Sequence, residues 1–140
     1  MWRYLQVVLF SWMVGNGDLH AKNVSVLRRF RPGRPGEPPV LEHVELTPFY
    51  DLVNTRLHIP NDDFALPLEG RRNNLSLRQF QRLAARWGTP KDAVRRETER
   101  LAGEVQGVLL STLDESGLPG ELQERYRGIV NDSVQSLVGA

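Results

Sequence analysis

The chain contains no cysteine among its 140 residues. This absence excludes disulfide bonds and metal sites built on thiolates, and it fits a protein of the reducing cytoplasm. A strong excess of one charge is also missing, because 18 basic residues are balanced by 17 acidic ones. We therefore expect no direct binding to nucleic acid or to an anionic membrane surface. The length and the hydrophobic fraction of 40% predict a single globular domain over residues 1–140.

Long hydrophobic runs are absent as well, and a membrane span would need about 20 apolar residues. The longest candidate is LQVVLFSWMV at residues 5–14, which is similar in composition to the core of a signal peptide. Only Arg3 precedes it among basic residues, and no small-residue cleavage site follows it. We interpret the run as part of a buried helix that ends at Gly15 and Asn16.

Two partly alternating stretches, residues 23–30 and 40–46, predict the strands of a β-hairpin. The segment RRFRPGRPGEPP, residues 28–39, links the two and overlaps the end of the first; it is rich in arginine, proline and glycine and is expected to form an exposed loop or hairpin tip. Pro48 ends the second strand because proline cannot donate a hydrogen bond to the ladder.

The second half of the chain has helical spacing. We expect a helix over residues 76–87 capped by Ser76 or Asn74, a long amphipathic helix over 89–117, and a last helix over 120–140. The long helix is expected to have its N-cap at Thr89, with Pro90 in its first turn. The predicted fold class is α+β, mainly α, in which a buried helix, a polar loop and a β-hairpin precede a helical bundle.

The polar loop is the segment GNGDLHAKN, residues 15–23, between the buried helix and the hairpin. Loops held by rigid flanks commonly carry reactive groups. If the hairpin returns Asp51 to the start of its first strand, oxygen atoms of Asp18, Asn23 and Asp51 would share one pocket. Such oxygen ligands suit Mg²⁺, which leaves coordination sites free for phosphate oxygens. Asp18 could then orient or deprotonate an attacking hydroxyl, and Lys22 could neutralise a transferred phosphoryl group.

The spacing of Asp18 and Asn23 matches the Asp–four residues–Asn pattern of the kinase catalytic loop, which a metal-binding Asp follows later in the chain. This spacing alone is common, but here a helix precedes it and Asp51 follows the predicted hairpin. The segments SWMVGNGDLHAKNVSVL and LTPFYDLV resemble the carboxyl-terminal lobe of HipA-like serine/threonine kinases, the toxins of bacterial toxin–antitoxin modules. The resemblance is close over residues 8–53 and looser over 64–88.

This resemblance implies that Asp18 is the catalytic base and that Asn23 and Asp51 bind Mg²⁺ and, through it, ATP. It also implies that His20 and Lys22 shape the loop and support the phosphate charge. The expected partners are a protein substrate, such as an aminoacyl-tRNA synthetase, and a HipB-like antitoxin. The structural alternatives are a cap or turn residue for Asp18, Asn23 and Asp51, a hydrogen-bonding strut for His20, and plain solvent exposure for Lys22.

Two features depart from the family pattern. The loop of the hairpin is longer than usual, and the sequence has neither a glycine-rich phosphate loop before the motif nor an upstream strand with an ATP-binding Lys. We therefore expect the amino-terminal ATP lobe to be absent from this chain, either lost or supplied by a separate chain. The isolated chain is expected to be inactive, because kinases clamp ATP between two lobes.

Two other functions stay open. GDLHAKN is also similar to the loop of aminoglycoside and choline kinases, which are small-molecule phosphotransferases, although LTPFYDLV differs from their metal-binding segment. The second is a non-catalytic remnant that binds a partner through an exposed apolar surface of the first helix.

Overall fold

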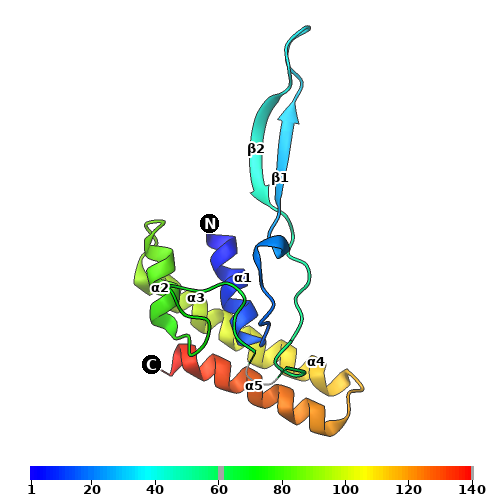
Figure 1. Cartoon of the computed structure of the whole chain (residues 1–140), viewed down its shortest axis with the longest axis vertical. Coiled ribbons are helices and arrows are strands. Elements are labelled where there is room, and N and C mark those ends of the chain that lie inside the picture. Colours follow the sequence, from blue (N-terminus) through cyan, green and yellow to red (C-terminus); the bar gives the residue numbers. More distant parts are fainter. Residues whose placement is uncertain (60–61, 140) are drawn as a thin grey trace.

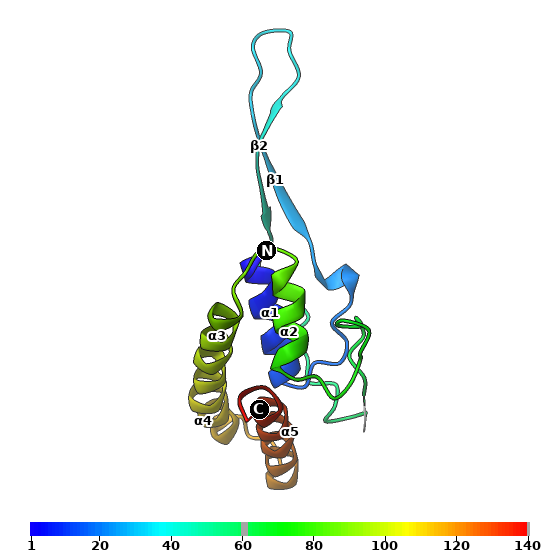
Figure 2. The same ribbon diagram turned by 90° about the vertical axis from the view of Figure 1, so that its left-hand side faces the viewer.

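The computed structural model describes residues 1–59 and 62–139 as a body of helices from which a β-hairpin projects (Figures 1 and 2). The first half of the chain forms α1 (Trp2–Met13), the 3₁₀ turn η1 (Ala21–Asn23), β1 (Val26–Arg31) and β2 (Val40–Leu46). The second half forms α2 (Leu77–Ala85), α3 (Lys91–Glu104), the π-helical turn η2 (Val105–Leu109), α4 (Leu110–Glu115) and α5 (Gly120–Val138). The predicted α+β class, mainly α, is confirmed.

Helix α1 lies at the centre of the body, where α2, α3 and α5 pack against it. Its residues Leu5, Leu9 and Met13 are fully buried, and each such side chain contributes about 1.5–3 kcal/mol by leaving water. No side chain caps α1, so packing rather than capping holds this helix. Of the exposed apolar surface expected on the first helix, Trp2 is exposed at 38%, and Val7 and Phe10 are partly buried. Within the described residues, no helix is both long and apolar enough to cross a membrane.

The two strands pair antiparallel, as predicted, but the first begins three residues late because residues 21–23 form η1. The register shifts by one residue between Arg29 and Phe30. Because side chains alternate along a strand, this shift keeps Leu41 on the same face as Val26, Phe30 and Val44, while Leu27 and Val40 lie on the opposite face. The first of these faces, the apolar hairpin face, carries Val26, Phe30, Leu41, Val44 and Leu46, with Arg28 among them. All of β1 and most of β2 are exposed, so no described part of the chain covers this face.

In the second half, the N-cap of α2 is Ser76, not Asn74, and the amide N–H and hydroxyl of Ser76 both donate to Gln79 Oε1. The predicted long helix is wrong in two details. Its cap is Pro90 rather than Thr89, and the π-helical turn η2 interrupts it. Two glycines, Gly103 and Gly107, weaken the helix at this point, because glycine costs about 1 kcal/mol in a helix interior.

Candidate functional site

The polar loop leaves α1 at Gly15, which has a φ of +73° that favours glycine. The Gly15 carbonyl accepts hydrogen bonds from the backbone N–H groups of Thr55 and Arg56 at 3.2 and 3.3 Å. Gly17 is required for a different reason, since a Cβ there would lie 2.8 Å from Thr55 Oγ1 and overlap the Asp62 carboxylate. The loop is thus held by Thr55, Arg56 and Asp62, which lie outside the helices and strands.

The structure brings Asn23 and Asp51 together although they are 28 residues apart, with Asn23 Nδ2 donating to Asp51 Oδ2 at 2.7 Å. The hairpin accounts for this contact, because Asn23 precedes β1 and Asp51 follows β2. A second hydrogen bond orients the Asn23 side chain: its amide oxygen, Oδ1, accepts from the backbone N–H of His20 at 3.0 Å. Asn23 is only 3% exposed, whereas Asp51 is open to solvent.

Asp51 has a φ of +59°, in the left-handed region. A residue other than glycine in such a conformation costs about 1–3 kcal/mol and persists only where its surroundings hold it. The backbone at Asp51 is therefore strained at the point where its carboxylate meets Asn23.

Two residues at this junction, Tyr50 and Ser25, were missed by sequence reasoning. The Tyr50 hydroxyl donates to the backbone carbonyl of Lys22 at 2.8 Å. Ser25 Oγ lies 2.8 Å from the same hydroxyl and acts as its donor, because the single phenolic proton is directed at Lys22. The signal available in the sequence was the tyrosine directly before the candidate metal-binding Asp in LTPFYDLV.

Asp18 is the one exposed residue of the stretch 11–19, and its side chain is 62% exposed. Its Oδ1 lies 4.0 Å from His20 Nε2, an ion pair only when the imidazole is protonated. His20 thereby connects the candidate residues. Its ring approaches the Asp18 carboxylate, while its backbone N–H donates to Asn23 Oδ1. The other ring nitrogen, Nδ1, is buried without a hydrogen-bond partner in the described part of the chain. The Lys22 side chain is exposed.

The donor set at this junction is small. Within the described residues, no group of three or more carboxylate or imidazole side chains is arranged to hold a metal ion. Asp51 offers a carboxylate and Asn23 an amide oxygen, which fits an ion such as Mg²⁺ that keeps several waters and takes phosphate oxygens as further ligands. The Asn23 nitrogen now faces Asp51, so ligation by both side chains would replace the hydrogen bond between them.

An aromatic layer supports the loop from the core. The Arg56 guanidinium lies 4.2 Å from the centroid of the Trp12 ring, and Phe64 meets the same ring edge-on at 6.0 Å. Burial lowers the pKa of Arg56, while the neighbouring carboxylates of Asp62 and Asp63 oppose this shift. The layer ties Arg56 and Phe64 to α1, next to the polar loop.

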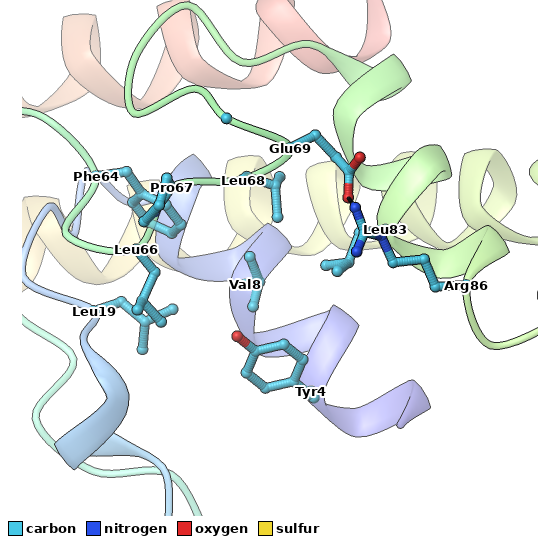
Figure 3. A pocket seen from close by; sticks show the side chains of 11 residues that line it. Tyr4, Val8, Leu19, Phe64, Leu66, Pro67, Leu68, Glu69, Leu83 and Arg86 are labelled. Atoms are coloured by element: carbon cyan, nitrogen blue, oxygen red, sulfur yellow. Dashed lines mark ion pairs between the residues drawn. The ribbon is translucent and has the colours of Figure 1, made fainter.

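A cavity of about 260 Å³ lies behind the loop, between α1, residues 64–70 and α2 (Figure 3). Leu19, which directly follows Asp18, forms part of its apolar wall together with Val8. On the opposite side, Glu69 and Arg86 form an ion pair at 2.8 Å. Burial raises the pKa of Tyr4, which also lines this cavity. The cavity is therefore bounded by apolar side chains on the loop side and by an ion pair on the α2 side.

Comparison with known proteins gives one family match. The model of the HipA-like C-terminal domain matches residues 1–109, from α1 through the turn η2. The matched region includes Asp18, Asn23 and Asp51, together with the whole hairpin. The search of curated proteins finds no match for the chain.

Proposed function

The chain belongs to the family of HipA-like C-terminal domains, and from this premise we propose that it forms the catalytic side of a protein kinase. The reaction is transfer of the γ-phosphoryl group of ATP, bound with Mg²⁺, to a Ser or Thr hydroxyl of a protein. The observation that carries the proposal is the contact of Asn23 with Asp51 at 2.7 Å, across 28 residues of sequence. Those two residues are the candidate ligands of the kinase pattern.

In this proposal, the Asp51 carboxylate and the Asn23 amide oxygen hold Mg²⁺. When bound, the ion supplies charge neutralisation for the phosphate oxygens. Asp18 accepts the proton of the attacking hydroxyl at its exposed carboxylate, where a protein side chain can reach it. His20 orients this carboxylate, and the exposed Lys22 amine is available to phosphate oxygens.

The nucleotide of a kinase is clamped between two lobes, and the described fold contributes one side of such a site. We propose that a second lobe, on the same polypeptide or on a separate chain, completes it. The family resemblance further supports a role as the toxin of a toxin–antitoxin pair in the cytoplasm. In that role the protein substrate is an aminoacyl-tRNA synthetase, and a HipB-like antitoxin holds the kinase.

The metal site is tested by titrating the ¹⁵N-labelled chain with Mn²⁺, in the presence and absence of ATP, and following paramagnetic broadening of NMR signals. Broadening is expected to centre on Asn23 and Asp51. Asp51→Asn should weaken the effect at least about tenfold, because it removes the only carboxylate of the pair. Asp132→Asn, the same change at an exposed site on α5, should bind Mn²⁺ like the wild type.

Broadening centred elsewhere, absent at millimolar Mn²⁺, or insensitive to Asp51→Asn would contradict the proposed site. The substrate class is tested with labelled ATP and the chain joined to an ATP lobe. Label on protein supports the proposal. Label on an aminoglycoside or on choline would favour the small-molecule phosphotransferase instead.

A further inference from the structure

We propose that Tyr50 and Ser25 form a hydroxyl clamp that holds Asp51 in position against Asn23; its purpose, presenting Asp51 to a divalent ion, rests on the proposed function. The clamp is a chain of two hydrogen bonds, from Ser25 Oγ to the Tyr50 hydroxyl and from this hydroxyl to the Lys22 carbonyl, each 2.8 Å long. Tyr50 directly precedes Asp51, and Lys22 directly precedes Asn23. The clamp therefore joins the two backbone segments that carry the candidate ligands.

The clamp continues the hairpin beyond the point where its regular ladder ends. The backbone N–H and the hydroxyl of Thr47 both donate to the Ser25 carbonyl, at 3.0 and 3.3 Å. Pro48 then interrupts regular pairing, because it has no N–H to donate. From there to Asp51, side-chain hydroxyls replace backbone groups as the links between the two segments.

The strained backbone of Asp51 gives the clamp a function. A φ of +59° must be held by the surroundings, and Asp51 is exposed and receives little support from packing. Its hydrogen bond to Asn23 cannot be the lasting support, since ligation of an ion by both side chains replaces that bond. The clamp uses two hydroxyls and a backbone carbonyl, none of which is a candidate ligand. It can therefore hold Asp51 in both the free and the loaded state.

The test compares Tyr50→Phe, which removes only the hydroxyl, with Tyr4→Phe, the same change within the helical body. The first readout is solvent exchange of the Asn23 Nδ2 protons, measured by NMR on the full chain without metal. We expect Tyr50→Phe to speed this exchange roughly fivefold to tenfold, the effect of losing one net hydrogen bond. Exchange of the Trp12 indole N–H, which donates to Ser136 Oγ at 3.1 Å, should stay at its wild-type rate. Tyr4→Phe should leave both rates unchanged.

The second readout is the Mn²⁺ concentration at which the NMR signals of Asn23 and Asp51 reach half of their full broadening. This concentration should rise by a similar factor in Tyr50→Phe. Ser25→Ala should shift both readouts in the same direction, and Ser25→Thr, which keeps a hydroxyl donor, should restore them. Wild-type values in Tyr50→Phe would overturn the clamp, as would faster exchange of Asn23 and Trp12 alike, which indicates general loosening. Selective loss of Asn23 protection in a chain whose wild type binds no Mn²⁺ would support the clamp and contradict the proposed function.

Discussion

Replacing Phe64 with alanine is expected to lower the free energy of unfolding by about 3–5 kcal/mol. Phe64 is 1% exposed and meets the Trp12 ring edge-on at an interplanar angle of 87°. The substitution removes buried apolar surface and an aromatic pair, and it leaves an enlarged cavity behind the polar loop. Urea denaturation at 25 °C measures the change. A loss of this size is a large fraction of the 5–15 kcal/mol typical of a whole domain.

Phe30→Ala is the matched control, because the same atoms are removed from a ring that is 55% exposed on β1. Its effect should stay within about 0.5 kcal/mol, as for most surface substitutions. If both variants lost the same stability, Phe64 would not be the core residue that its burial indicates.

Gly15→Ala is expected to cost about 2–5 kcal/mol, from two separate causes. A φ of +73° costs an alanine about 1–2 kcal/mol relative to glycine. The new Cβ would also lie 2.8 Å from Ile129 Cγ2 and 3.1 Å from Asn54 Oδ1, and such overpacking typically costs a further 1–3 kcal/mol. Chemical denaturation gives the total, and the amide signals of residues 16–23 report whether the loop moves.

Gly88→Ala separates the two causes, because Gly88 has the same φ of +73° but a Cβ there would have no neighbour within 4 Å. It should lose only the conformational part, about 1–2 kcal/mol. Equal losses in the two variants would show that α5 does not constrain the loop at Gly15.

The sequence was sufficient for the elements whose apolar residues recur with a clear period. The hairpin and α2 were predicted in this way, whereas α1 was predicted from its continuous apolar run. The approach of Asp51 to Asn23 followed from topology, because an antiparallel hairpin returns the chain to its starting point. The chemical roles of Asp18, His20, Lys22, Asn23 and Asp51 stay predictions.

Other features depend on contacts that no local pattern encodes. The network of Gly17, Thr55 and Asp62 joins segments about 40 residues apart, through side chains of an irregular stretch. The left-handed backbone of Asp51 and the clamp of Tyr50 arise only once the hairpin has closed. The turn η2 lies within a sequence of ordinary helical spacing, so periodicity could not distinguish it from α-helix. Strand alternation predicted the two strands, but not that one face of the hairpin is largely apolar and exposed.

The apolar hairpin face also sets how the isolated chain should behave in a test tube. Isolated two-stranded ribbons are only marginally stable, and uncovered strand edges readily pair with further strands. The exposed apolar side chains on the face of this ribbon, and the unpaired backbone groups along its edges, favour association with other copies of the chain. Sedimentation velocity should therefore give an average mass that rises with concentration, and Val44→Lys should restore a constant monomer mass. Self-association, rather than unfolding, would then limit the concentration at which the chain can be studied.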